Sequence, residues 1–168
     1  VELQATAKAG VVTIGKFRAI SGDMTVDVTG APAYADGNLN LEIRAENVRL
    51  SRLEPWLGKD TPGGTLSALF AVRGPASAPD IRGSAEIVKP AFGALALDQL
   101  RASTIQITSN RIEIPDILLT AAGYQASASA SIPWNWATLS VPNDEPIRLA
   151  ADLGPQSLAV LNVFGPIV

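Results

Sequence analysis

The 168-residue chain contains no cysteine and no histidine. Their absence excludes thiolate chemistry, the usual zinc sites and an imidazole general base. Charged residues make up only 17% of the chain and the formal net charge is -3, so the chain lacks the basic surface that nucleic-acid-binding proteins present. We therefore expect neither nucleic-acid binding nor a metal or organic cofactor.

Aromatic residues are also scarce, at 5%, although hydrophobic residues reach 47% because alanine is abundant. The apolar surface is therefore broad but built from small side chains. No apolar run approaches the length that spans a bilayer, and the chain begins without an initiator methionine or a basic leader. We expect a segment of a longer protein.

Alternation of apolar and polar residues recurs along most of the chain, as is typical of strands with one wet face. In "YQASASASIP" (residues 124–133) tyrosine, three alanines and isoleucine share one face, and glutamine and three serines share the other. Similar patterns cover residues 24–28, 38–46, 65–73, 105–107, 112–114, 117–121 and 147–151. Turn-forming pairs separate them, including Gly63-Gly64, Gly74-Pro75, Ser109-Asn110 and Asn143-Asp144. The pattern predicts an antiparallel all-β chain of short strands in series.

Two segments favour short helices instead. Residues 50–58 place leucine, leucine and tryptophan at helical spacing, with Ser51 and Glu54 as a capping box and Gly58 as the C-cap. Residues 154–165 repeat this design with a proline at the start and a glycine at the end. The recurrence suggests two internal repeat units, roughly 1–58 and 59–165, within a single elongated segment.

Catalytic motifs are missing from the sequence, so we expect a protein that is not an enzyme. Asp23 and Asp27 would share the outer face of a strand, where a glycosidase would need one of them in an apolar pocket with a raised pKa, but solvated edge charges fit them better. Asp144 and Glu145 could face a calcium ion, but they lack the spaced oxygen ligands of a calcium loop. We expect an exposed turn there.

Four aromatic residues leave three alternatives open: Tyr34, Tyr124, Trp134 and Trp136. They could form a platform that stacks on sugars, belong to a membrane-facing belt, or close the end of the sheet. The last alternative is favoured for Trp134 and Trp136, which follow the strand at residues 124–133.

A sheet that grows in series with one apolar face must cover that face. Two short helices are too small to do so. The sheet therefore either closes into a sandwich or curls and leaves an apolar channel for chains that slide past without specific polar contacts. The inward-facing positions carry few polar groups, which favours the channel.

The stretch "GGTLSALFAVRGPASAPDIRGSAEI" (residues 63–87) resembles the recurrent G-x-L-x5-V-x-G-x4-P-x3-G-x3-I phrase of the TamB and AsmA-like family of double-membraned bacteria. The resemblance is best over residues 50–132. It implies an elongated antiparallel sheet curled into a half-open hydrophobic groove. Proteins of this group are anchored in the inner membrane by an N-terminal helix, cross the periplasm and are thought to carry phospholipids towards the outer membrane. TamB itself partners an outer-membrane barrel of the Omp85 class.

By this resemblance, the chain is a periplasmic conduit segment whose partners are phospholipid acyl chains. Many inward positions are alanine where the family often has larger side chains, so the groove is expected to be narrower or partly filled. A β-sandwich binding or adhesion module and a structural scaffold for outer-membrane protein assembly remain alternatives. Unpaired edges also make self-association plausible. The expected lipid-contacting wall consists of Leu39, Leu41, Ile43, Leu66, Phe70, Val72, Ile87, Ile105, Ile107, Ile114, Leu119, Ala126, Ala128 and Ala130.

Overall fold

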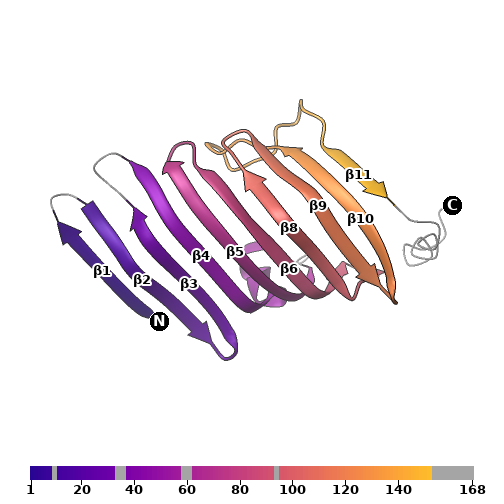
Figure 1. Ribbon diagram of the computed structural model, residues 1–168, viewed down its shortest axis with the longest axis horizontal. Helices are drawn as coiled ribbons and strands as arrows, with labels where there is room; N and C mark the ends of the chain where they lie inside the picture. The colour runs from indigo at the N-terminus through magenta and orange to yellow at the C-terminus, as the bar shows by residue number, and fades with distance from the viewer. Residues whose placement is uncertain (9–10, 33–36, 58–61, 93–94, 153–168) are drawn as a thin grey trace.

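The computed structural model describes residues 1–8, 11–32, 37–57, 62–92 and 95–152. These residues form one antiparallel sheet, with ten strands in line and one short strand beside them (Figure 1). In chain order the strands are β1 (Glu2–Lys8), β2 (Val11–Ser21), β3 (Met24–Pro32), β4 (Asn38–Arg49), β5 (Gly63–Pro75), β6 (Asp80–Phe92), β7 (Leu95–Ala96), β8 (Gln99–Ile107), β9 (Arg111–Ala121), β10 (Tyr124–Pro133) and β11 (Arg148–Asp152).

The sheet grows in one direction, because each strand pairs with its neighbours in the chain. The short β7 pairs with β6 outside this line, and β8 takes the next place in the sheet. β1 and β11 therefore stand at opposite edges, and the sheet does not close (Figure 1). The predicted class, an antiparallel all-β chain with strands in series, is confirmed.

The strands form where the sequence alternates. In β4, Leu39, Leu41, Ile43 and Ala45 are half-buried and the residues between them are exposed. Successive side chains of a strand point to opposite faces, so this burial pattern follows directly from the sequence. The alternation breaks at Asn47, whose φ of 55° lies in the left-handed region that asparagine tolerates.

The predicted helix after β4 is present but short. It consists of a 3-10 turn, η1 (Leu50–Leu53), and one α-helical turn, α1 (Glu54–Leu57). The expected capping box is wrong: the N-cap residue of η1 is Arg49, and it makes no side-chain capping hydrogen bond. Burial holds the segment instead, because Leu50 is only 5% exposed. The second expected helix, at residues 154–165, and Gly58 lie outside the described residues.

The sequence predicted a turn between strands at Gly63-Gly64, and this prediction is wrong. The pair is the start of β5. The register between β5 and β6 shifts at this point, and Gly64 has a φ of 111°. A Cβ on Gly64 would lie 2.9 Å from Cγ2 of Ile87. Glycine is therefore needed for an irregular strand start that passes close to β6.

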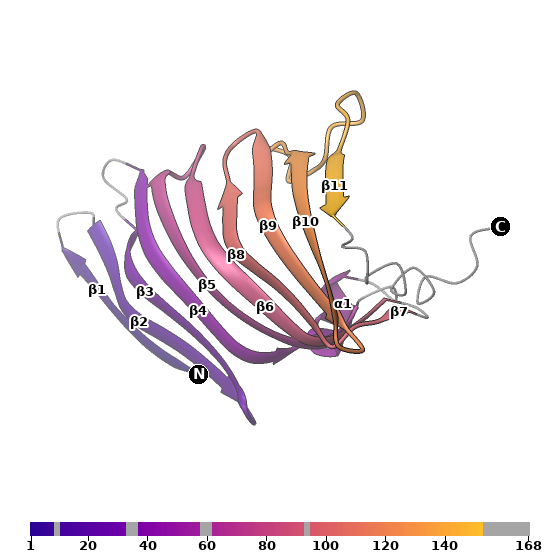
Figure 2. The same ribbon diagram turned by 45° about the vertical axis from the view of Figure 1, so that its right-hand side comes forward.

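Several further register shifts interrupt the pairing of the middle strands. They occur after Ala45 in β4, between Gly83 and Ala85 in β6, after Ala102 in β8 and between Ala128 and Ala130 in β10. Such bulges bend a strand and increase its twist. Figure 2 shows the strands bending along their length.

No second layer packs on the sheet within the described residues. The substantial contacts join strands that neighbour each other in the sheet, or join η1 and β7 to the strands beside them. The two facing sheets of the sandwich alternative are therefore not formed by this part of the chain. β4 pairs directly with β5, so the sheet also continues across the boundary suggested between residues 58 and 59.

Candidate functional site

All fourteen residues expected to form a lipid-contacting wall lie on one face of the sheet. Residues directly opposite each other in an antiparallel pair share a face. The pairs Ile43–Phe70 and Leu66–Ile87 join β4 to β5 and β5 to β6 on this face. The pairs continue to β11 through both large and small residues: Gly83–Ile105, Ile81–Ile107, Leu100–Leu119, Leu119–Ala126, Ile114–Ala130 and Ala128–Ala151. We call this surface the apolar face.

The apolar face is only half-covered. Leu66, Phe70, Ile87, Ile105 and Leu119 are all of intermediate exposure, although they lie in the middle strands. The large hydrophobic side chains of a packed core are usually buried almost completely. Neighbouring side chains on the same sheet provide the partial burial, and none of the described elements lies over the middle of this face to complete it.

A row of small residues crosses the apolar face at right angles to the strands. The register places Ala45, Ala68, Ala85 and Ala102 side by side, then Ile117, and then Ala128 and Ala151. We call this the alanine row. The register shifts in β4, β6, β8 and β10 each begin or end at a member of the row. The strands are therefore irregular at the level where the apolar side chains are smallest.

Larger side chains flank the alanine row on both sides. One flank contains Ile43, Phe70 and Ile105, and the other contains Leu66, Ile87, Leu100 and Leu119. Sequence reasoning had placed many of these residues on one face, but it had not identified the row. Each alanine looks like a weak core position in its own strand, and only the pairing of strands brings them together.

The large side chains at one end of the apolar face are better covered than those in its middle. At this end, Leu50 of η1 and Leu97 after β7 are 5% and 6% exposed. Near the other end Val72 is 7% exposed and Pro79 is fully buried, but Leu39, Ile81 and Ile107 are half-buried like the middle of the face. The second end is therefore covered only beside the turn between β5 and β6. Sequence reasoning missed Leu97, which lies in the short connection between β6 and β8, where apolar and polar residues do not alternate.

A pocket of about 300 Å³ lies on the apolar face between β9 and β11. Leu97 forms part of its wall, together with Leu119, Ala126, Tyr124 at the start of β10, and Leu149 of β11. Its lining is almost entirely apolar, apart from the tyrosine and Ser129. Alanines on β10 and β11 leave the space that larger residues would occupy.

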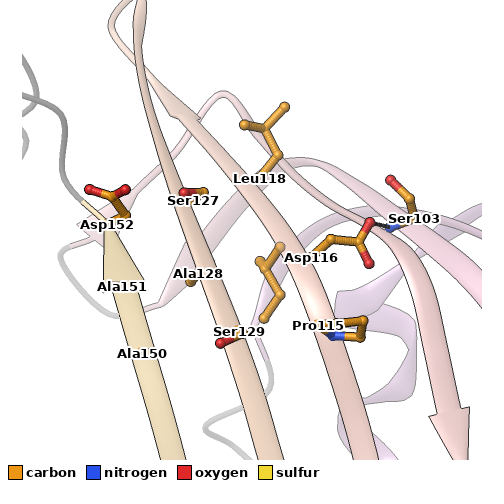
Figure 3. A pocket seen from close by; sticks show the side chains of 11 residues that line it. Ser103, Pro115, Asp116, Leu118, Ser127, Ala128, Ser129, Ala150, Ala151 and Asp152 are labelled. Atoms are coloured by element: carbon orange, nitrogen blue, oxygen red, sulfur yellow. Dashed lines mark hydrogen bonds between the residues drawn. The ribbon is translucent and has the colours of Figure 1, made fainter.

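A second hollow, of about 460 Å³, lies on the opposite face at the same strands (Figure 3). Asp116, Ser127 and Asp152 line it, and Oδ2 of Asp116 accepts a hydrogen bond of 3.2 Å from the backbone N–H of Ser103. The other oxygen, Oδ1, is buried and has no hydrogen-bond partner within the described residues. The two hollows share Ile117, Ala128, Ser129, Ala150 and Ala151, and all of these except Ile117 have small side chains.

The polar face carries paired charges. Arg18 donates two hydrogen bonds, of 2.6 and 3.0 Å, to the carboxylate of Asp27, which lies opposite it on β3. This hydrogen bonding lowers the pKa of Asp27. A hydrogen bond from its own backbone, followed by those from Arg49, lowers the pKa of Asp23. A glycosidase general acid needs a raised pKa, and Asp23 lies in the turn after β2, so the two carboxylates do not form the catalytic pair considered above.

The remaining candidates also have structural roles or fall outside the description. Glu145 lies 3.8 Å from Arg111, and Asp144 is in an exposed turn. The described residues contain no cluster of acidic side chains that could hold a metal ion. Trp134 and Trp136 lie at the end of the sheet, where the indole N–H of Trp136 donates to the carbonyl of Ala76. Tyr34 is outside the described residues.

Comparison of the chain with known protein families, with curated proteins and with solved structures finds no match. Where the structure describes the chain, its helical turns are too short to traverse a bilayer. The functional inference therefore depends on the geometry of the apolar face.

Proposed function

We propose that this chain is a segment of a hydrophobic conduit that binds phospholipid acyl chains without chemical reaction. The observation that carries the proposal is the apolar face, on which the fourteen expected wall residues lie together and all but Val72, Ala126 and Ala130 remain only half-buried. Large contiguous apolar patches on a soluble surface mark sites of interaction with a partner, a ligand or a membrane. Acyl chains need no polar anchors, and this face offers few.

In this proposal the sheet curls into a half-open groove around the apolar face. The register shifts beside the alanine row support the curl, because bulges bend strands at the level where they occur. Small side chains favour the same geometry, since side chains on the inside of a bend converge and alanine occupies the least space there. The larger residues on both flanks would form the sides of the groove.

The pocket between β9 and β11 gives this proposal its best-defined contact. Leu97, Leu119 and Leu149 surround a space of about 300 Å³ with an apolar lining, which suits one stretch of acyl chain. Tyr124 stands at its rim and is 40% exposed. In this proposal its hydroxyl would contact the lipid's polar end.

The wider setting of the proposal follows the resemblance to TamB and AsmA-like proteins. The segment would lie in the periplasm within a longer protein that is anchored in the inner membrane and delivers lipid towards the outer membrane. An Omp85-type barrel would be its partner there. The open edges at β1 and β11 would allow the sheet to continue into adjoining segments or a second copy.

The proposal is tested by extracting lipids from the chain purified from a membrane-containing lysate and identifying them by mass spectrometry. Ala128→Arg puts a charge on the apolar face, and Ser127→Arg puts the same charge on the exposed polar face of the same strand. We expect Ala128→Arg to lose the lipid and keep a folded β-type circular dichroism spectrum. Ser127→Arg should keep both.

Two results would count against the conduit. Lipid-free wild-type protein would favour a structural scaffold. Global unfolding of Ala128→Arg, with Ser127→Arg still folded, would indicate that the apolar face is packed against protein and not open to lipid, because a buried unpaired charge is very costly.

A further inference from the structure

The connection from β10 to β11 crosses one end of the sheet. After Pro133 the chain passes over the ends of neighbouring strands towards the turn between β5 and β6 (Figure 1). There the indole Nε1–H of Trp136 donates a hydrogen bond of 3.0 Å to the carbonyl oxygen of Ala76, sixty residues away in the chain. We call residues 134–140 the strap.

Two backbone hydrogen bonds anchor the strap on the way. The N–H of Trp134 donates to the carbonyl of Asn110, and the N–H of Trp136 donates to that of Ser109, each at 3.0 Å. Both acceptors lie in the turn between β8 and β9. Ala76 in turn donates its N–H to the carbonyl of Gly37, at 2.9 Å. The strap therefore connects the end of β10 to two turns that belong to four other strands, and Ala76 extends the connection to Gly37 before β4.

The strap reaches the sheet beside a covered part of the apolar face. Val72 near the end of β5 and Pro79 before β6 are among the most buried residues of the described chain. Phe70 in the same strand, and Ile81 and Ile107 in line with Val72, are only half-buried. The cover at this end is therefore local to the β5–β6 turn, where Trp136 of the strap donates its hydrogen bond to Ala76.

The outer part of the strap is exposed, and its hydrogen bonds run within the strap itself, between Asn135 and Ser140 and from Ala137 and Thr138 to Asn135. Ala137, Thr138, Leu139 and Ser140 are exposed, and Leu139 is 64% exposed despite its apolar side chain. The indole N–H of Trp134 is buried and finds no acceptor within the described residues. A buried unpaired donor opposes the closed state, because it recovers a hydrogen bond with water on opening. One indole thus favours the closed strap and the other favours the open one.

We propose that residues 134–140 are a releasable strap that controls access to the apolar face at this end of the sheet. Closed, the Trp136–Ala76 hydrogen bond holds the end of β10 to the β5–β6 turn. Released, it frees the two ends to separate and exposes the covered part of the apolar face. The strap is independent of what the face binds, and only its effect on acyl-chain entry rests on the function proposed above.

Phenylalanine substitutions at the two tryptophans make a matched pair, because each keeps an aromatic ring and removes one indole N–H. Hydrogen exchange of the backbone amides of residues 76, 134 and 136 measures strap opening without any ligand. Trp136→Phe should raise these exchange rates about fivefold, which corresponds to one lost hydrogen bond. Trp134→Phe removes the unpaired donor and should leave the rates unchanged or lower them.

The converse experiment holds the strap closed with a covalent cross-link. The chain has no cysteine, so Ala76→Cys with Trp136→Cys provides one specific pair for a short bismaleimide cross-linker. Entry of a pyrene-labelled fatty acid, followed by stopped-flow fluorescence, should be slower in the cross-linked protein than in the same variant before cross-linking. It should be faster in Trp136→Phe than in wild type.

The outcomes separate the strap from the proposed function. Equal exchange rates in Trp136→Phe and wild type would overturn the strap, whatever the fatty acid does. If amide exchange is faster in Trp136→Phe than in wild type but a fatty acid that binds enters both at the same rate, the strap does not control access to the apolar face. Failure of the fatty acid to bind wild type would instead contradict the proposed function, and the exchange rates would still decide whether the strap opens.

Discussion

Ala68 of β5 lies directly opposite Ala85 of β6 on the apolar face. Ala45 and Ala102 extend this pair to both sides, so four neighbouring strands place their smallest side chain at one level. Register shifts begin or end at Ala45, Ala85 and Ala102. The alanine row therefore marks the level at which the strands leave regular pairing, and it makes the sheet sensitive to side-chain size there.

A larger side chain at Ala102, a buried member of the alanine row, should destabilise the sheet. Ala102 is 4% exposed, so Ala102→Leu forces extra volume between close neighbours and should lower the free energy of unfolding by about 1–3 kcal/mol. Ala150→Leu, at an exposed position of β11, should change it by less than about 0.5 kcal/mol. Urea unfolding of both variants measures the difference. Equal stability of Ala102→Leu and Ala150→Leu would show that the alanine row accommodates a larger side chain without strain.

An uncovered apolar face should respond weakly to truncation. Leu50→Ala removes a side chain that is 5% exposed and should cost about 2–4 kcal/mol, as in a packed core. Leu66→Ala removes the same atoms from a half-buried position on the apolar face and should cost only about 1–2 kcal/mol. The comparison uses the free energy of unfolding without lipid. A cost for Leu66→Ala as large as that for Leu50→Ala would mean that something covers the face.

Gly83 should be irreplaceable in β6. A Cβ there would overlap the carbonyl oxygen of Leu69 and the ring of Phe70, which pass directly over it. Gly83→Ala should therefore cost roughly 2 kcal/mol or more, because backbone and ring must both move.

Gly15 provides the control for this substitution, since it also lies within a strand. A Cβ on Gly15 would make ordinary contact, 3.6 Å from the carbonyl oxygen of Gln4. Gly15→Ala should be neutral or slightly stabilising, because alanine restricts the unfolded chain. Thermal unfolding of the two variants tests the contrast, and a similar loss at both positions would contradict it.

Acid should weaken the pairing of β2 with β3. The hydrogen bonds from Arg18 lower the pKa of Asp27, and those from its own backbone and from Arg49 lower the pKa of Asp23. Both carboxylates bind protons more readily in the unfolded chain, whose carboxyl pKa is about 3.9. The contribution of both carboxylates to the free energy of unfolding is complete above that pH. It is lost as the pH falls through their lower pKa values in the folded protein.

The test is the urea midpoint measured between pH 6 and pH 2. Asp27→Asn should lower stability at pH 6 and should flatten the loss on acidification compared with wild type. Glu42→Gln, which removes one charge from an exposed position of β4, should keep the wild-type slope. A wild-type slope in Asp27→Asn would show that the Arg18–Asp27 pair does not govern the acid response.

Much of the fold could be predicted because alternation is a local property. In β10, the residues of "YQASASASIP" divide between the apolar and polar faces as the sequence predicts. The helical segment was predicted from its leucine spacing, although its cap was not, because Arg49 enters η1 directly from a strand. Gly63 and Gly64 were misread as a turn, since glycine serves turns and strand bulges equally.

The candidate site was predictable in its members but not in its arrangement. Alternation assigned Phe70, Ile105 and Ala128 to one face without stating which of them are neighbours. The connection between β6 and β8 that contributes Leu97 shows no alternation of apolar and polar residues. The hydrogen bond from Trp136 to Ala76 joins residues sixty positions apart in the chain. Neither could be read from local sequence.

The sequence by itself determined which residues are apolar, which face each strand gives them and that the strands follow one another in series. These properties depend on neighbours in the chain and on the period of two that every strand imposes. Only the tertiary structure decided the register that lines up the alanines, the bulges beside them and the strap that links β10 to the β5–β6 turn. These features depend on hydrogen bonds between distant segments, and a shift of one residue in any pairing would have arranged the same side chains differently.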